Sequence, residues 1–265
     1  MTVDPLPLPP SNLRQLVGPL EDHWYDNPSG QAVFEGLPSE NYRSVLDFGC
    51  GCGRLARQLI QQSPRPDSYL GLDLHAGMIA WCERHLGSAA HGFEFRHHDV
   101  HNPAFNPTSA NRWLPFPVED GGRTLVLAWS VFTHLVEAQA RFYLGECARA
   151  LSRDGVLLST WFLFDKADFP MLQAFQNALF INDADPSNAV LFDRQWVVGT
   201  MREVGLTAHR IQAPRTRGFQ WQIWATPTRP GVQAADFPPD VAPRRHRHPP
   251  TLPPGDVARL GFEDD

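Results

Sequence analysis

Residues 45–54 read Val-Leu-Asp-Phe-Gly-Cys-Gly-Cys-Gly-Arg, and this stretch decides the fold of the chain. An apolar strand runs directly into glycines at alternate positions. Glycine lets the backbone turn tightly and approach a ligand closely, because it has no Cβ. A helix that begins at about Arg54 would direct its free N–H groups and the positive end of its dipole at this turn. A strand, a glycine turn and a helix N-terminus together predict a cradle for a nucleotide-type cofactor.

The spacing of the glycines indicates which cofactor the cradle holds. A dinucleotide fingerprint reads G-x-G-x-x-G, whereas the glycines here are Gly49, Gly51 and Gly53, preceded by Asp47. This string resembles motif I of the class I S-adenosylmethionine-dependent methyltransferases. The resemblance implies S-adenosylmethionine as cofactor, with Cys50 and the three glycines beside it. It also implies that Asp47 takes up the cofactor's ammonium, directly or through water, and such contacts contribute roughly 1.5–3 kcal/mol each.

A second acidic residue stands where the same family holds the ribose. The resemblance implies an acid at the end of the second strand, and Asp73 ends the predicted strand 68–73, with Leu74 directly after it. Asp73 lies a little over twenty residues past the glycine turn, which is also the distance of the ribose acid in the dinucleotide fold. Asp73 is expected to bind the ribose hydroxyls, although a helix N-cap is an alternative role.

Two later segments extend the resemblance, which covers roughly residues 40–165. The family places an acid near the adenine after the third strand, and Asp99 matches it, with Val100 as an apolar contact to the ring. Residues 128–135 resemble the S-V-F-T-H-L segment that follows the fourth strand in a bacterial branch of the family. This adds Ser130 to the expected cofactor contacts.

Alternating strands and helices predict the architecture. Strands are expected at 44–48, 68–73, 93–96, 124–129, 156–161, 206–211 and 219–225, and helices at 53–62, 76–86, 137–150, 168–180 and 193–204. This alternation predicts an α/β fold with a parallel sheet covered on both faces. The resemblance implies a Rossmann-like, seven-stranded, mostly parallel sheet with helices on both faces and one antiparallel edge strand.

The chain divides into three parts by composition. Residues 1–40 are expected to form an N-terminal helical segment or cap, with one short helix from Ser11 and another that includes residues 32–34. Residues 41–226 form the predicted S-adenosylmethionine-binding domain. Residues 227–265 are crowded with proline and polar side chains, and we expect this tail to be disordered.

The composition indicates the cellular compartment and disfavours several classes of ligand. The chain has 265 residues and a net charge of −6, which argues against a nucleic-acid partner. It has no run of about 18 apolar residues, so no membrane span is expected. The four cysteines are expected to be reduced in a cytoplasmic protein. No metal is expected, because no second Cys/His pair has zinc spacing and the adjacent His97 and His98 would point opposite ways on an extended segment.

Methyl transfer from a sulfonium needs positioning more than a protein nucleophile, although a base helps when the acceptor is a hydroxyl. His134 is the candidate base, because it follows the fourth strand at the edge of the sheet where α/β ligands bind. A purely structural role for His134 is the alternative.

Aromatic residues suggest an apolar, flat or sugar acceptor, and the expected substrate pocket contains Trp24, Tyr25 and Trp161. The connection 101–122 is a candidate lid.

The predicted function is therefore methyl transfer to a small-molecule or glycan acceptor, at oxygen. One alternative is a Rossmann-type oxidoreductase that uses a nicotinamide cofactor, which the glycine spacing and Asp47 disfavour. Another is a non-catalytic protein that keeps the cofactor as a structural ligand. A DNA or RNA methyltransferase is disfavoured by the charge, and because Ala128-Trp129-Ser130-Val131 stands where such enzymes carry an Asn/Asp-Pro-Pro-Tyr/Phe signature.

Overall fold

The computed structural model of the chain describes residues 6–182, 184–216 and 218–240. Its strands are β1 (Ser44–Phe48), β2 (Ser68–Asp73), β3 (Phe93–His97), β4 (Arg123–Ala128), β5 (Leu151–Phe164), β6 (Ala178–Phe180), β7 (Val190–Asp193), β8 (Leu206–Gln212) and β9 (Trp221–Pro227). Its α-helices are α1 (Ser11–Val17), α2 (Arg54–Gln61), α3 (Ala76–Cys82), α4 (Glu137–Ala150) and α5 (Arg194–Glu203). Single-turn helices add Asp22–Trp24, Ser39–Tyr42, Glu83–Gly87, Phe132–His134 and Lys166–Asp168.

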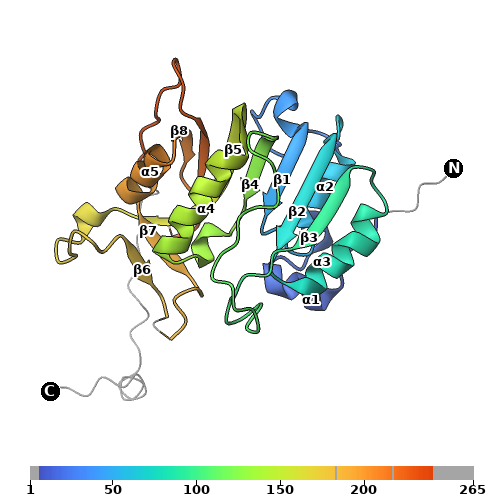
Figure 1. Ribbon diagram of the computed structural model, residues 1–265, viewed down its shortest axis with the longest axis horizontal. Helices are drawn as coiled ribbons and strands as arrows, with labels where there is room; N and C mark the ends of the chain where they lie inside the picture. Colours follow the sequence, from blue (N-terminus) through green and yellow to red (C-terminus); the bar gives the residue numbers. More distant parts are fainter. Residues whose placement is uncertain (1–5, 183, 217, 241–265) are drawn as a thin grey trace, which may run out of the picture.

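The described strands form one sheet with a parallel centre (Figure 1). Strands β3, β2, β1, β4 and β5 lie side by side and run parallel. Strand β9 pairs antiparallel with β5 through Leu157–Trp161, and β8 pairs antiparallel with β9. The last residues of β5 continue into a parallel pair with β7. The predicted Rossmann-like, mostly parallel fold is confirmed. The antiparallel strand β9 is not itself at the edge of the sheet, because β8 pairs with its outer side. Strands β6 and β7 were not predicted.

Helices cover both faces of this sheet, as the continuous apolar strands require. On one face, α4 and α5 pack against Leu46, Val126 and other buried residues of the strands. On the other face, α2 and α3 pack against Val45, Leu125 and their neighbours. The core is therefore split into two layers by the sheet, and the central strands are buried from both sides.

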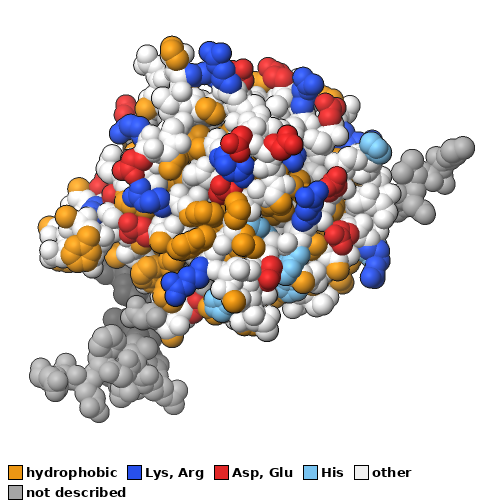
Figure 2. Space-filling model, in the orientation of Figure 1, with side chains coloured by type: hydrophobic (Ala, Val, Ile, Leu, Met, Phe, Trp, Pro, Cys, Tyr) orange, Lys and Arg blue, Asp and Glu red, His pale blue; other side chains and the backbone are white. Residues whose placement is uncertain are grey.

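The helix expected at 168–180 is wrong. Asp165 caps a single turn at Lys166–Asp168, and the chain then reverses into β6, which pairs antiparallel with β7. Proline disfavours the helical conformation of the residue before it, and Phe169, which precedes Pro170, has the non-helical angles φ −127° and ψ 69°. Large hydrophobic side chains are exposed along this connection: Phe169, Met171, Phe175, Phe180 and Ile181. Hydrophobic atoms accordingly gather at the left of Figure 2, over the connection between β5 and β7.

The N-terminal segment contains one short α-helix, α1, and no second helix at residues 32–34. The backbone N–H groups there are taken by side chains of the domain instead. The N–H of Val33 donates to Oε1 of Gln62 at 2.8 Å, and the N–H of Phe34 donates to the Tyr42 hydroxyl at 2.8 Å. The segment therefore lies as an irregular cover over the domain rather than as a helical pair.

A buried arginine fixes this cover to the domain. The guanidinium of Arg57, on α2, donates to the carbonyls of Leu6, Pro7 and Tyr25 at 2.6–3.2 Å and forms an ion pair with Asp26. Its side chain is 5% exposed. The charge is therefore almost fully removed from water, and its partners among the described residues lie in the N-terminal segment.

Removal of this arginine is expected to destabilise the fold strongly. Arg57→Ala should lower the free energy of unfolding by about 3–5 kcal/mol, because it removes the donor to three carbonyls and the ion-pair partner of Asp26. The matched control is Arg43→Ala, whose ion pair with Asp67 is 73% exposed on both sides and should contribute less than about 1 kcal/mol. Urea denaturation of both variants measures this, and equal losses would contradict the anchoring role.

Residues 227–240, the first part of the segment expected to be disordered, pack onto the domain. The N–H of Ala235 donates to the carbonyl of Ala208 at 2.8 Å. Phe237 packs edge-on against Trp221, and the guanidinium of Arg194 lies over both rings at 5.5 and 4.5 Å. The rest of the tail, 241–265, lies outside the described residues. None of the described helices is long and apolar enough to span a membrane.

Candidate active site

A cavity of about 400 Å³ lies at the carboxyl ends of β1, β2 and β4. The glycine turn after β1 forms its floor, and the loops after β2, β3 and β4 form its walls. Leu16 and Val17 of α1 and residues 185–187 close over it from outside the central sheet. Segments far apart in the sequence thus meet at the edge of the sheet where ligands of this architecture bind.

The glycine turn requires glycine for two physical reasons. Gly49, Gly51 and Gly53 have φ angles of 79°, 55° and 80°, in the left-handed region that disfavours other residues. A Cβ on Gly49 would lie 2.3 Å from Cγ2 of Val131, and one on Gly51 would lie 2.7 Å from Cγ1 of Val17. The turn is therefore packed tightly by the loop after β4 and by α1.

Asp73 holds the glycine turn against the loop after β2. Its Oδ2 accepts a hydrogen bond from the N–H of Gly51 at 2.8 Å, and its Oδ1 accepts one from the N–H of His75 at 2.8 Å. Asp73 and Leu74 both line the cavity. Removal from water raises the pKa of the Asp73 carboxyl above its ordinary value, against the effect of these two donors. The carboxylate thus lies at the cavity wall, where the ribose contact was predicted.

Asp47 is a buried acid with one unsatisfied oxygen. Its Oδ2 accepts a hydrogen bond from the Tyr69 hydroxyl at 2.6 Å, whereas its buried Oδ1 has no hydrogen-bond partner among the described residues. Burial raises the pKa of the carboxyl to about 7, with the nearby Asp73 adding to the rise. A buried acceptor without a donor is costly, and Asp47 is one of the residues that line the cavity. Asp47 therefore fits a cationic ligand group.

Arg54, which was not predicted as a site residue, also lines the cavity at the first position of α2. Burial lowers the pKa of its guanidinium, while the fields of Tyr25 and Asp47 oppose this effect. In the described part of the chain it forms no ion pair. The guanidinium of Arg54 and the free carboxylate oxygen of Asp47 lie beside the same turn. Together they fit a ligand that carries both a carboxylate and an ammonium group. The sequence signal was present, because Arg54 ends the glycine motif.

The segment after β3 places one predicted residue in the cavity and the other outside. Val100 lines the cavity, as does His98, which is buried and bonded to the Tyr143 hydroxyl at 3.0 Å. Burial lowers the pKa of His98 to about 4, so the ring is neutral at pH 7. Asp99 does not line the cavity: its carboxylate faces solvent and accepts a hydrogen bond from Nδ2 of Asn106 at 2.9 Å. Side chains alternate along extended backbone, so neighbours face opposite ways.

Ser130 and His134 follow β4 and line the cavity. Ser130 is the one non-glycine residue with positive φ, 61°, in the described chain. Its N–H donates to Oγ1 of Thr160 at 2.7 Å, and Nε2 of Gln220 donates to its Oγ at 2.8 Å. These bonds hold a strained turn in place. Nδ1 of His134 contacts the carbonyl oxygen of Ser187 at 3.0 Å.

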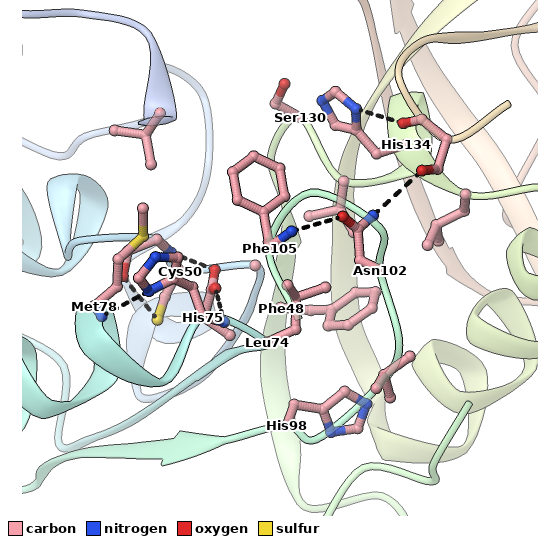
Figure 3. A pocket seen from close by; sticks show the side chains of 18 of the residues that line it. Phe48, Cys50, Leu74, His75, Met78, His98, Asn102, Phe105, Ser130 and His134 are labelled. Atoms are coloured by element: carbon pink, nitrogen blue, oxygen red, sulfur yellow. Dashed lines mark hydrogen bonds between the residues drawn. The ribbon is translucent and has the colours of Figure 1, made fainter. Parts of the chain in front are cut away.

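Of the ten predicted cofactor residues, only Gly53 and Asp99 lie outside the cavity wall. Gly53 lies at the start of α2, beneath the turn, where a Cβ would be 2.4 Å from Leu86. Figure 3 shows how the labelled side chains of Cys50, Leu74 and Ser130 surround the same space.

None of the three residues predicted for the substrate pocket, Trp24, Tyr25 and Trp161, lines the cavity. Trp161 is fully buried within β5 and stacks on Phe132 with ring centroids 4.1 Å apart. Trp24 is 51% exposed, and Tyr25 is buried with its hydroxyl on the carbonyl of Pro19. The apolar walls come instead from Trp129 and from residues of the expected lid and the loop after β4, namely Pro103, Phe105, Leu135 and Val136.

All four cysteines are buried and free of disulfides. Cys50 and Cys52 line the cavity, and burial raises the pKa of both thiols. Within the described ranges, no group of three or more His, Cys, Asp or Glu side chains comes together to hold a metal ion.

Comparison with known proteins finds a matching family model and several similar folds. Residues 45–155 match the family model described as a methyltransferase domain. An S-adenosylmethionine-dependent methyltransferase from Aquifex aeolicus superposes with a TM-score of 0.52 at 15% identity, over 84% of this chain and 100% of that one. One from Leishmania major gives 0.50 at 15%, over 72% and 66% of the two chains.

A third similar structure is an O-methyltransferase from neocarzinostatin biosynthesis, solved with S-adenosylmethionine and 2-hydroxy-5-methyl naphthoic acid. It superposes with a TM-score of 0.50 at 14% identity, over 72% of this chain and 51% of that one. At these identities the structural likeness establishes the fold.

Proposed function

We propose that this chain, which belongs to the class I S-adenosylmethionine-dependent methyltransferases, transfers a methyl group from S-adenosylmethionine to the oxygen of a small-molecule acceptor. One observation carries the proposal. A free carboxylate oxygen of Asp47 and the available guanidinium of Arg54 lie beside the glycine turn of a single cavity. They match the ammonium and carboxylate at the amino-acid end of the cofactor. A nicotinamide cofactor would present a pyrophosphate to this acid, so that alternative is not favoured.

The other residues of the cavity hold the rest of the cofactor in this proposal. Asp73 lies at the end of β2 and accepts hydrogen bonds from the ribose hydroxyls. Leu74, Met78 and Val100 supply apolar contacts to the adenine. His98 is neutral and buried, so it can hydrogen-bond to the base without placing a charge there. The bound cofactor supplies a methyl group already activated by its sulfonium.

The acceptor lies against the apolar wall formed by Trp129, Phe105 and Leu135. Such a wall fits a molecule with a flat apolar ring. A sugar ring stacked on Trp129 is the alternative acceptor. The similar fold whose structure contains a naphthoic acid supports the small molecule.

His134 acts as the base in this proposal. Nε2 would take the proton of the acceptor hydroxyl as that oxygen receives the methyl group that the bound cofactor would supply. The residues therefore contribute orientation, exclusion of water and one proton site. Positioning of this kind can contribute about 7–11 kcal/mol.

A direct assay tests the proposal. The protein is incubated with S-adenosylmethionine and a panel of naphthols, hydroxybenzoates and sugars, and the products are analysed by mass spectrometry. The expected result is S-adenosylhomocysteine together with an acceptor heavier by one methylene, at a rate that falls in His134→Gln. Cofactor binding with methylation of amines or thiols alone would contradict transfer to oxygen.

Arg54→Gln is expected to weaken S-adenosylhomocysteine binding by roughly tenfold to one hundredfold, the range for a lost charge-assisted bond of about 1.5–3 kcal/mol. The substitution removes the charge proposed to hold the cofactor's carboxylate. A second ligand, 5′-methylthioadenosine, provides the control. It lacks the amino-acid end of the cofactor, so Arg54→Gln should bind it as the wild type does. Calorimetry measures both affinities. An equal loss for both ligands would show that Arg54 supports the turn rather than the carboxylate.

The raised pKa of Asp47 predicts a pH dependence of binding. Below about pH 7 the free protein must lose a proton from Asp47 before that oxygen pairs with an ammonium. Affinity for S-adenosylhomocysteine should therefore rise by up to about tenfold per pH unit below pH 7 and level off above it. The apo protein should lose stability as pH rises through 7, because the unfolded chain ionises this carboxyl at a lower pH. A binding profile equally steep in Asp47→Asn would contradict this assignment.

A further inference from the structure

Two loops from distant parts of the sequence meet over the acceptor end of the cavity (Figure 3). One is the segment 102–106 after β3, and the other is 185–187 before β7. Nδ2 of Asn102 donates to Oγ of Ser187 at 3.4 Å, and this bond joins the loops.

Each loop has hydrogen bonds of its own on its side of that contact. Oδ1 of Asn102 accepts hydrogen bonds from the N–H groups of Ala104 and Phe105 at 3.0 and 3.1 Å, so the amide is fixed in orientation. Asn102 is only 8% exposed. On the other side, the hydroxyl and N–H of Ser187 both donate to Oδ1 of Asp185, at 2.6 and 3.1 Å. Together these hydrogen bonds determine the orientation of the Ser187 carbonyl group.

The Ser187 carbonyl determines which nitrogen of His134 carries the proton. A carbonyl oxygen can only accept, so its 3.0 Å contact with Nδ1 requires a proton on Nδ1. In the neutral ring Nε2 is then unprotonated and can accept a proton. Nε2 has no partner among the described residues, and Figure 3 draws the ring beside Ser130 at the cavity.

We infer that Asn102 and Ser187 are positioning residues that hold His134 in its base-competent tautomer when the two loops are joined. The inference rests on the proposed function in one respect, because the tautomer matters for catalysis only if His134 acts as the base. The acceptor's proton moves to Nε2 as described above, and no further reactant is needed. Closure of the loops over the acceptor and readiness of the base are thereby coupled through one carbonyl.

The tautomer can be observed directly, before any acceptor is known. Nitrogen-15 spectra of histidine-labelled protein distinguish a protonated from an unprotonated ring nitrogen, and His134→Gln assigns the signals. In the neutral wild-type ring, Nδ1 should be protonated and Nε2 unprotonated. Ser187→Ala and Asn102→Asp should each move the two shifts toward a mixture of tautomers. Asn102→Asp keeps the oxygen that accepts from Ala104 and Phe105 but replaces the donating amide.

Ser109→Ala is the matched control, because Ser109 lies in the same connection and bonds the Asp99 carbonyl without touching Ser187. It should leave the His134 signals unchanged. An Nε2–H tautomer in the wild type, or unchanged signals in both loop variants, would overturn the inference. Titration of the same samples with S-adenosylhomocysteine separates this failure from failure of the proposed function, because cofactor binding does not require the His134 tautomer.

Discussion

Asp73→Ala is expected to lower the affinity for S-adenosylhomocysteine by roughly one hundredfold, or about 2.7 kcal/mol. Two effects add in this variant. The glycine turn loses the carboxylate that accepts from Gly51 and His75, and the ribose loses its proposed acceptor. Hydrogen bonds to a charged group contribute about 1.5–3 kcal/mol each, so the loss of more than one makes this a large effect on binding.

The matched control is Asp99→Ala, the acid at the end of the neighbouring strand. The family resemblance implied a cofactor contact there, but its carboxylate lies in solvent and bonds Asn106. Calorimetric titration should give this variant an affinity within about threefold of the wild type, since it removes an exposed group outside the cavity. Equal losses in the two variants would contradict the assignment of the ribose acid.

Gly49→Ala is the second large effect, and it should both destabilise the protein and abolish cofactor binding. The added Cβ would lie 2.3 Å from Cγ2 of Val131, at a φ of 79°. The left-handed conformation costs roughly 1–2 kcal/mol for a residue with a side chain, and overpacking a tight site typically costs about 1–3 kcal/mol. The free energy of unfolding should therefore fall by about 2–5 kcal/mol.

A glycine elsewhere in the domain provides the control. Gly145 lies within α4, its φ is not positive, and a Cβ there would meet nothing within 4 Å. Gly145→Ala should leave binding unchanged and stabilise the protein by about 0.5–1 kcal/mol, because alanine favours helices. Urea denaturation and titration measure both properties. A Gly49→Ala variant that folds and binds like the wild type would refute the tight-turn account.

The cofactor end of the site could be predicted from the sequence because local geometry determines it. Alternate glycines at positive φ and an acid at the end of a neighbouring strand are consequences of short-range chain geometry. The structure places Asp47, Gly51 and Asp73 around one cavity accordingly. Arg54 was missed because its residue type alone does not show that it lacks an ion-pair partner in the folded chain.

The acceptor end could not be predicted, because long-range packing determines it. Trp161 was expected to follow a strand ending near 161, but β5 continues to Phe164 and carries the ring into the core. The residues that close the cavity include Phe105 and Ser187, from two irregular connections with no periodic pattern. A long-range side-chain contact, Asn102 to Ser187, joins the two connections, and no local propensity encodes it.

Calorimetric titration of the purified protein with S-adenosylmethionine, S-adenosylhomocysteine and NAD tests the central claim most directly. Micromolar binding of the first two, none of NAD, and an affinity roughly one hundredfold lower in Asp73→Ala are the predicted results. Binding of NAD alone, or full binding of S-adenosylhomocysteine by Asp73→Ala, would contradict the account of this site.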